Sequence, residues 1–286
     1  MGGLRRNGLV SVVVPTRNSA RFLTACLDSV KHQTYGSIEI IVVDNHSEDE
    51  TRAIAERYTP KVFTWGPERS AQVNFGAKQA QGEYIYKVDS DFVLERDVVE
   101  SCVDAIERGF DAVVVHNSPD PRVGWIAELR KFEVDMYKYD LTHSSARFVK
   151  MTVFESIGGY TEIMTAGEDY DFQNRLNRSG FRTEYVEPEA LHLGEPVSFW
   201  KHMLKYFRYG KDFVAYRNQN RKAARKQLAF VRGVYVRNWR RFVQHPFLGA
   251  AFVAYNTCKF AFGAAGFTAA TVQTRMKHVG LRRRSR

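Results

Sequence analysis

In the first two thirds of the chain, short continuous runs of hydrophobic residues alternate with segments whose hydrophobic residues recur at helical spacing. Residues 9–14 and 38–43 are continuous apolar runs, as expected of strands buried on both faces of a parallel sheet. Further strands are predicted at residues 62–64, 84–88, 112–115, 147–151 and 182–186, and helices at 19–33, 47–58, 70–81, 96–108, 124–139 and 168–178. This alternation predicts an α/β fold with a mostly parallel sheet flanked by helices.

The strand at 84–88 is followed by two carboxylates one residue apart, Asp89 and Asp91. Acidic side chains at the carboxyl end of a strand in an open α/β sheet lie in the crevice where ligands bind. Their hard oxygens suit Mg²⁺ or Mn²⁺, and the phosphates of a substrate complete the coordination shell of such an ion. The pattern indicates a metal-held diphosphate, although an ordinary acidic turn supplies the same two residues.

Other predicted strand ends and helix starts carry polar groups suited to a nucleotide. They are Pro15, Thr16, Arg17 and Asn18 after the first strand, Asp44 and Asn45 after the second, and Arg69 and Asn74 around the start of the 70–81 helix. The amino end of that helix favours anions. Asp44 is suited to a ribose hydroxyl or base edge, or to helix capping; the arginines are equally compatible with solvated surface charges.

A second cluster lies between residues 158 and 192. The pair Gly158-Gly159 indicates close backbone approach or positive φ, and Gly167 precedes Glu168 and Asp169 in the first turn of a predicted helix. A carboxylate there could be a general base near an acceptor hydroxyl, or a helix cap. Two more candidates are Arg175, for an acid or a phosphate, and His192, which is predicted to lie in a loop, for a metal.

Five segments, taken in order, resemble the GT-A glycosyltransferases of family 2. They are Val-Ser-Val-Val-Val-Pro-Thr-Arg-Asn (10–18), Glu-Ile-Ile-Val-Val-Asp-Asn-His-Ser-Glu-Asp (39–49), Arg69 with Asn74-Phe75-Gly76-Ala77, the segment 82–91, and Gly158-Gly159-Tyr160 before Gly167-Glu168-Asp169. The resemblance covers roughly residues 9–196. Tyr170 to Arg175 depart from the hydrophobic acceptor signature common in that family, so the motifs leave the acceptor class open.

The resemblance implies an inverting transfer of the hexosyltransferase type from a UDP or GDP sugar. Asp44 would contact the base or ribose, Asp169 would be the base with Glu168 beside it, and His192 matches a histidine that completes the metal site in many relatives. The expected donor-binding residues are Pro15, Thr16, Arg17, Asn18, Asp44, Asn45, Arg69, Asn74, Asp89, Ser90 and Arg175. The expected ligands of Mn²⁺ or Mg²⁺ are Asp89, Asp91 and His192.

Charge divides the chain near Pro196. Residues 1–196 hold 22 Lys and Arg against 31 Asp and Glu, whereas residues 197–286 hold 20 against a single acid, Asp212. These balances of −9 and +19 predict a catalytic domain at 1–196 and a second region at 197–286 with an anionic partner. Three scattered cysteines and no signal-peptide segment at the amino end lead us to expect free thiols and a cytosolic site of action.

The basic region has the pattern of a membrane-associating segment. Residues 199–213 combine aromatic side chains at helical spacing with interleaved lysines, which suits an anionic lipid surface. Packing on the catalytic domain and nucleic acid are the alternatives, and no nucleic-acid partner is expected. Residues 247–273 contain 21 apolar or glycine residues of 27 and one charge, Lys259, with basic residues on both sides. Because one span would oppose the positive-inside tendency, we expect a peripheral, monotopic or re-entrant helical pair, with a single span as the alternative.

The sequence therefore predicts a metal-dependent glycosyltransferase that uses a lipid-linked acceptor, such as a polyprenyl phosphate or a lipid-linked saccharide, at the cytosolic membrane face. Its role would lie in polysaccharide or glycolipid synthesis. Two other hypotheses remain: a sugar-phosphate nucleotidylyltransferase, which shares the sheet, and a non-enzymatic basic membrane adaptor. A nucleotidylyltransferase would need a glycine-rich loop with a basic residue directly after the first strand, where this chain has Pro15, Thr16, Arg17 and Asn18.

Overall fold

A computed structural model describes residues 8–141, 144–164, 167–219 and 232–284, without the side chains of 212–219 and 274–284. The chain divides into two compact units. The sheet unit comprises Met1–Asp120 and Tyr137–Gly194, and the helical unit comprises Pro121–Met136 and Glu195–Arg286. Contacts thus separate the units near the sequence boundary at 196, but they also group residues 121–136, which the sequence division left in the first region, with the helical unit.

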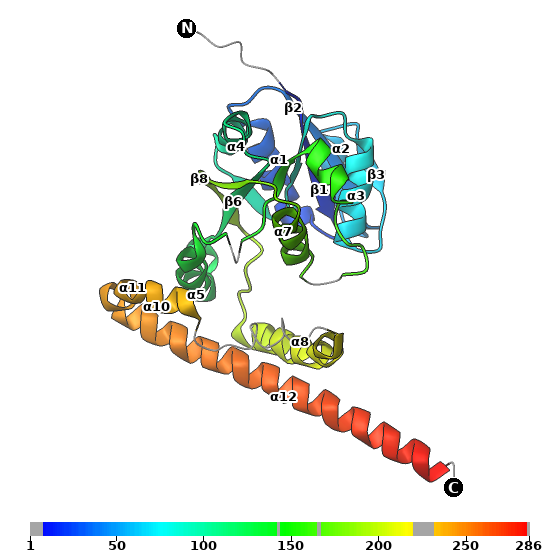
Figure 1. Ribbon diagram of the computed structural model, residues 1–286, viewed down its shortest axis with the longest axis vertical. Coiled ribbons are helices and arrows are strands. Elements are labelled where there is room, and N and C mark those ends of the chain that lie inside the picture. Colours follow the sequence, from blue (N-terminus) through cyan, green and yellow to red (C-terminus); the bar gives the residue numbers. More distant parts are fainter. Residues whose placement is uncertain (1–7, 142–143, 165–166, 220–231, 285–286) are drawn as a thin grey trace. The chain divides into compact units, whose positions relative to one another are not determined.

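The sheet unit contains eight strands among the described residues, in the order β3-β2-β1-β4-β7-β6-β8-β5. Their bounds are β1 Val10–Thr16, β2 Ile38–Asp44, β3 Val62–Thr64, β4 Tyr84–Lys87, β5 Phe92–Leu94, β6 Ala112–Pro119, β7 Phe148–Lys150 and β8 Thr183–His192. Strands β3, β2, β1 and β4 are parallel, as their apolar runs predict, and β7 runs antiparallel between β4 and β6 (Figure 1).

The helices of this unit flank the sheet: α1 Ala20–Lys31, α2 Thr51–Glu56, α3 Arg69–Gln79, α4 Val98–Glu107, α6 Met151–Ser156 and α7 Glu168–Arg178. The predicted α/β fold is confirmed. One helix start is wrong: α2 begins at Thr51 rather than near Ser47. Ser47 is held in the preceding loop instead, where its amide donates to Asp44 Oδ2 at 2.9 Å.

Two apolar cores lie on opposite faces of the sheet, and the alternation along each strand assigns side chains to one or the other. On β4, Tyr84 and Tyr86 belong to the core that includes Leu23 and Leu27 of α1. Ile85 belongs to the core that includes Phe172 of α7. Lys87 shares the face of Ile85, so its side chain points toward the start of α7.

Strand β8 extends further than the sequence indicates. Residues 182–186 were the predicted strand, whereas β8 runs to His192 and pairs there with Phe92 of β5, a strand the sequence analysis missed. His192 is therefore at a strand end rather than in a loop. This pairing brings His192 beside the loop that carries Asp91.

The helical unit contains η1 Pro121–Val123, α5 Trp125–Val134, α8 Phe199–Gln219, α10 Gly233–Arg237, α11 Trp239–Gln244 and α12 Pro246–Arg284; a 3₁₀ turn at Asp135–Tyr137, η2, follows α5. Helices α8 and α12 cross with almost no space between their backbones. A Cβ at Gly210 would lie 2.0 Å from Gly263 O, and one at Gly266 would lie 1.9 Å from Phe207 O. Glycine at these positions permits the close crossing.

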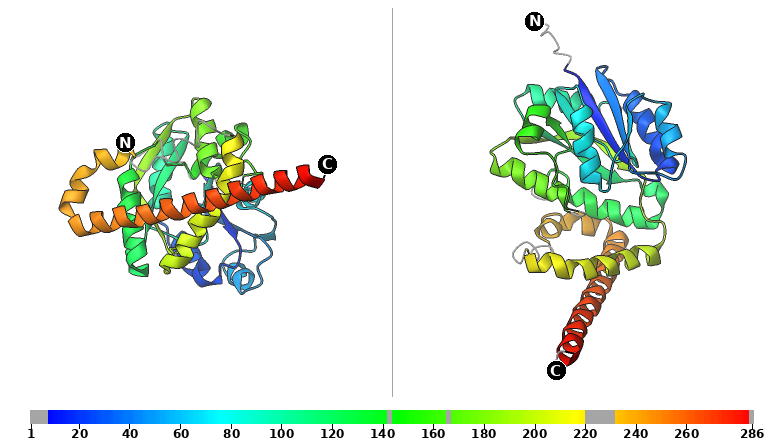
Figure 2. Two further views of the ribbon diagram at one scale, coloured as in Figure 1. Left: turned by 90° about the horizontal axis from the view of Figure 1, so that it is seen from below. Right: turned by 90° about the vertical axis from the view of Figure 1, so that its right-hand side faces the viewer.

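The expectation of a helical pair within residues 247–273 is wrong. This segment is part of one continuous helix, α12, drawn orange to red in Figures 1 and 2, and its close partner is α8. Lys259 is not exposed to an apolar medium: its Nζ lies 2.9 Å from Glu133 Oε2 of α5. Within the described residues, no helix combines the length and apolarity needed to cross a membrane. The basic residues Arg275 and Lys277 that follow the segment lie outside the described side chains.

Candidate active site

The loops after β1 and β2 meet and fix each other. Thr16, at the end of β1, donates from Oγ1 to Asp44 Oδ1 at 3.1 Å, and Asp44 is only 2% exposed. Gln72 of α3 bridges the two strand ends, donating to Thr16 O at 2.9 Å and to Val43 O at 2.6 Å. Asp44 thus holds the loop that follows β2. This structural role is close to helix capping, one of the two roles that the sequence leaves open for Asp44.

The remaining predicted donor residues of these loops differ in exposure. Pro15 is buried in β1, Arg17 is exposed, and Asn45 donates to Pro67 O. Asn18 has a φ of +48° and accepts from the Glu48 amide at 2.9 Å, which locks the loop after β1 against that after β2. Ser90 donates to Ser19 Oγ at 2.8 Å, so the loop after β4 is joined to the same rim.

Three cations and three carboxylates interlock beside this rim. Asp89 receives Arg147 Nη1 at 2.6 Å on Oδ2 and Arg69 Nη1 at 3.4 Å on Oδ1. Asp169 receives Lys87 Nζ at 2.7 Å on Oδ1 and Arg147 Nη2 at 3.2 Å on Oδ2. Glu168 receives Arg69 Nη2 at 3.1 Å. The structure thus brings together four of the candidate residues named from the sequence: Asp89, Glu168, Asp169 and Arg69.

Sequence reasoning missed Lys87 and Arg147. The Lys87 side chain is 2% exposed and that of Arg147 10% exposed, and each bridges two elements. Lys87 also stacks over the Tyr160 ring at 4.6 Å from its centroid. The available signal was alternation: a lysine on the same face as buried Ile85 needs an anionic partner, because a buried charge is costly unless it is paired.

These ion pairs set the protonation of the carboxylates. Burial alone would raise the pKa of Asp169, but Lys87 and Arg147 outweigh it, so the pKa lies below its usual value. Burial would likewise raise the pKa of Asp89. The charges of Arg147, Lys87 and Arg69 outweigh this effect, so the pKa of Asp89 lies well below its usual value. Both groups are therefore ionised at neutral pH.

The expected metal ligands are not gathered as a set of three. Both oxygens of Asp89 are paired with arginines, and in the described part of the chain no group of three or more His, Cys, Asp or Glu side chains is placed to hold a metal. Asp91 and His192, in contrast, face each other, with Oδ2 and Nε2 separated by 3.1 Å.

The Asp91–His192 pair fits one cation. A separation near 3 Å is what two adjacent ligands at about 2.1 Å from an octahedral ion require. Gly194 permits this close packing, since a Cβ there would lie 2.0 Å from Asp91 Oδ2 and 3.1 Å from His192 Nε2. The carboxylate suits Mn²⁺ or Mg²⁺, and a substrate diphosphate would supply further oxygen ligands.

Two predicted donor-binding residues are instead committed to loop structure. Asn74 exchanges two hydrogen bonds with the Tyr160 backbone, each 2.8 Å, and so fixes the turn at Gly159, whose φ is +65°. Arg175 donates to Asp171 Oδ2 at 2.9 Å and to Ile157 O at 2.6 Å. Their role in this structure is to support Tyr160 and the start of α7.

A family model described as "Glycosyl transferase family 2" matches residues 11–156. Among curated proteins, an uncharacterised glycosyltransferase of Rickettsia typhi is 26% identical over 204 residues, covering 64% of this chain and 62% of that protein. The chain thus spans about three fifths of the length of this relative.

Two solved structures share the fold. The mannosyltransferase PcManGT from Pyrobaculum calidifontis, in complex with GDP-Man and Mn²⁺, has a TM-score of 0.57 at 20% identity and covers 93% of this chain and 75% of that chain. S. aureus TarS 1-349 in complex with UDP-GlcNAc has a TM-score of 0.52 at 20% identity, covering 70% and 64%. Similarity at this level establishes a common fold.

Proposed function

The chain belongs to glycosyl transferase family 2, and on this premise we propose that it is a metal-dependent inverting glycosyltransferase. It moves a sugar from a nucleoside diphosphate donor to a lipid-linked acceptor at the cytosolic face of a membrane. The observation that carries the chemistry is the ion-paired cluster beside the end of β4, in which Asp169 is held ionised between Lys87 and Arg147.

Asp169 is the general base of this proposal. It is the most exposed of the three clustered carboxylates, at 26% for its side chain against 11% for Asp89 and 7% for Glu168. Its carboxylate accepts the proton of the acceptor hydroxyl as the hydroxyl oxygen attacks the anomeric carbon and the bond to the diphosphate breaks. Attack opposite the leaving group inverts the anomeric configuration.

The cations of the cluster bind and orient the donor. Arg69 is half exposed at the amino end of α3, where backbone amides also favour an anion. A diphosphate that reaches Arg69 and Arg147 competes with Asp89 for them, since charge-assisted hydrogen bonds to phosphate are comparably strong. Asp44 and Asn45, at the adjoining rim, are the candidates for contact with the nucleoside.

Asp91 and His192 would hold the divalent cation. When bound, this ion neutralises charge that develops on the leaving diphosphate. Support comes from the 3.1 Å separation of Asp91 Oδ2 and His192 Nε2. A likeness in fold to PcManGT, whose structure holds Mn²⁺ and GDP-Man, points in the same direction.

The lipid-linked acceptor and the membrane face rest on the helical unit. Large apolar side chains are exposed on it, among them Trp200, Trp239 and Phe247, and basic side chains dominate its charge. This combination suits an anionic lipid surface. A non-enzymatic adaptor would bind a membrane through the same surface and would catalyse no reaction. That hypothesis does not explain the ion-paired cluster of the sheet unit.

The deciding experiment incubates the full chain with a panel of UDP and GDP sugars, Mn²⁺ and a lipid extract, and measures nucleoside diphosphate release and the anomeric configuration of the product. We expect release that depends on the lipid fraction and disappears when a chelator removes the metal. Pyrophosphate formed from a sugar phosphate and a nucleoside triphosphate would instead support the nucleotidylyltransferase. Transfer only to water-soluble acceptors would overturn the lipid-linked acceptor.

A further inference from the structure

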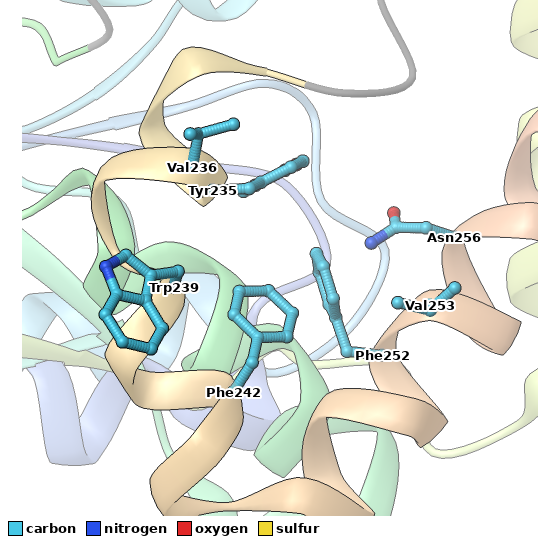
Figure 3. A pocket seen from close by; sticks show the side chains of 7 residues that line it. All are labelled: Tyr235, Val236, Trp239, Phe242, Phe252, Val253 and Asn256. Atoms are coloured by element: carbon cyan, nitrogen blue, oxygen red, sulfur yellow. The ribbon is translucent and has the colours of Figure 1, made fainter.

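An apolar pocket lies within the helical unit, between α10, α11 and α12, and its volume is about 260 Å³ (Figure 3). Its lining is Tyr235, Val236, Trp239, Phe242, Phe252, Val253 and Asn256. Phe252 is buried at its base, whereas Val236 and Trp239 are more than half exposed at its edge. Exposed apolar side chains continue along the same helices at Val243 and Phe247. The pocket therefore opens onto an apolar surface.

One polar group in this lining lacks a partner among the residues that the structure describes. Asn256 is 5% exposed, and its Nδ2 is buried without a hydrogen-bond acceptor in that part of the chain. Figure 3 shows this amide at the side of the pocket, among the aromatic rings. A buried donor without an acceptor is destabilising, so a ligand that brings an acceptor oxygen into the pocket binds more tightly.

The charged residues of the segment that forms the pocket are all basic, and Glu133 and Asp135 approach it from the preceding segment. Residues 232–273 carry Arg232, Arg237, Arg240, Arg241 and Lys259 and no acidic side chain. Lys259 is paired with Glu133, and Arg241 lies 3.8 Å from Asp135. Arg240, in contrast, is exposed and stacks its guanidinium over the ring of Trp239 at the pocket edge, 6.0 Å from the centroid. A ligand with a negative group outside the pocket therefore suits this surface.

We propose that this pocket binds one hydrocarbon chain of an ester-linked anionic phospholipid and thereby docks the helical unit on a membrane surface. The chain contacts Phe242 and Phe252, the ester carbonyl accepts from Asn256 Nδ2, and the phosphate lies by Arg240. Burial of several methylene groups favours binding more than a surface ion pair does, so even part of one hydrocarbon chain is sufficient to hold the lipid in the pocket. The proposal deepens the membrane face of the proposed function, yet it requires no catalysis.

Vesicle binding by the full chain tests it. Vesicles contain phosphatidylcholine with about one third phosphatidylglycerol, and binding is followed by flotation at about 0.15 M salt. Val253→Asp places a charge in the pocket wall, and Ala261→Asp places the same charge on an exposed position of α12 outside it. We expect the first change to weaken binding about tenfold or more and the second to have little effect. Equal losses would mean attraction by charge alone and would overturn the pocket.

The chemistry of the ligand is tested by the linkage of its chains. We expect the protein to bind vesicles of ester-linked phosphatidylglycerol about fivefold more tightly than vesicles of the ether-linked analogue. A factor of this size corresponds to one hydrogen bond. Asn256→Leu should remove this preference while retaining binding. Trp239 gives a local signal: lipids with brominated chains should quench it, and Trp239→Phe should lose that quenching.

Two outcomes contradict the assignment. A preference for ester lipids that survives in Asn256→Leu would exclude the contact with the amide. A dimer that forms without lipid and dissociates in Val253→Asp would assign the pocket to a second copy of this chain. Transfer to a lipid-linked acceptor solubilised in detergent, measured as nucleoside diphosphate released from the donor, is expected to be unchanged in the same variants, so failure of the docking site is distinguishable from failure of the proposed activity.

Discussion

Lys87 Nζ lies 2.7 Å from Asp169 Oδ1, although 82 positions separate the two residues in the chain. The contact joins the end of β4 to the first turn of α7. Arg147, which directly precedes β7, pairs with the other carboxylate oxygen of Asp169. A carboxylate held by two cations is ionised and fixed in orientation, which are the two requirements of a base that must meet an acceptor hydroxyl.

Replacing Asp169 by Asn should reduce turnover by about 10²–10⁴-fold and leave donor affinity near normal, because the base acts on the acceptor. Steady-state transfer rates and donor titration measure the two effects. Asp171→Asn, two positions along the same helix, is the matched control and should retain turnover. Activity above about one tenth of normal in Asp169→Asn would disprove the assignment and direct attention to Glu168.

Lys87→Met should shift the acid limb of kcat/KM to higher pH. The base works when ionised, so activity falls as pH falls through its folded pKa, which lies below the ordinary value of about 3.9. Without Lys87 the pKa of Asp169 rises, and the limb moves with it. A pH profile checks this, with exposed Lys78→Met as control. An unmoved limb with reduced activity at all pH values would assign Lys87 to the donor instead.

Gly194→Ala should weaken Mn²⁺ binding about 10- to 100-fold, as disturbance of groups supporting a metal site typically does. The added Cβ would lie 2.0 Å from Asp91 Oδ2, so the carboxylate must move away from His192. Calorimetric titration of Mn²⁺ in the presence of nucleoside diphosphate gives a readout independent of turnover. Gly36→Ala is the control, since no described residue lies within 4 Å of the Cβ that this change adds. Unchanged binding in both Gly194→Ala and Asp91→Asn would rule out this site.

Glu133→Gln should destabilise the chain by about 3–5 kcal/mol, because it leaves the Lys259 ammonium buried without an anion. The pair is 2.9 Å apart, and Lys259 is 8% exposed. The double variant Glu133→Gln with Lys259→Met should recover much of the loss. Urea unfolding measures both. Additive losses in the double variant would mean that the two residues stabilise the fold separately.

His202 should make stability depend on pH between about 6.5 and 4. Burial, helped by Arg130, Lys205 and Lys259, lowers the pKa of His202 to about 4, and its Nδ1 lies 2.6 Å from Tyr255 Oη. As the pH falls below about 6.5, the pKa of His in the unfolded chain, the unfolded chain binds the proton before the folded one does. The free energy of unfolding therefore decreases as the pH falls, by about 2 kcal/mol at pH 5.

Urea unfolding at pH 7 and pH 5 tests the role of His202. His202→Gln should remove most of the difference between the two pH values, whereas the same change at exposed His245 should not. A difference that persists in His202→Gln would assign the pH dependence to other groups.

The sequence by itself determined the α/β class, the order of most elements and the family. Continuous apolar runs such as residues 9–14 predict inner parallel strands, and this local pattern needs no knowledge of the rest of the chain. It also located Asp89, Asp169 and Arg69, because the polar groups at strand ends and helix starts must gather at one edge of such a sheet.

Tertiary structure decided which charges meet. Asp89 and Asp91 are separated by one residue, yet the first faces Arg147 and the second faces His192, because β8 continues to residue 192 and pairs with a three-residue strand too short to give a pattern. In the sequence, Lys259 is an isolated charge within an apolar segment. In the structure it pairs with Glu133, which lies 126 residues earlier in the chain. Partners of buried charges are chosen by packing across long sequence separations, and periodicity along the chain carries no record of them.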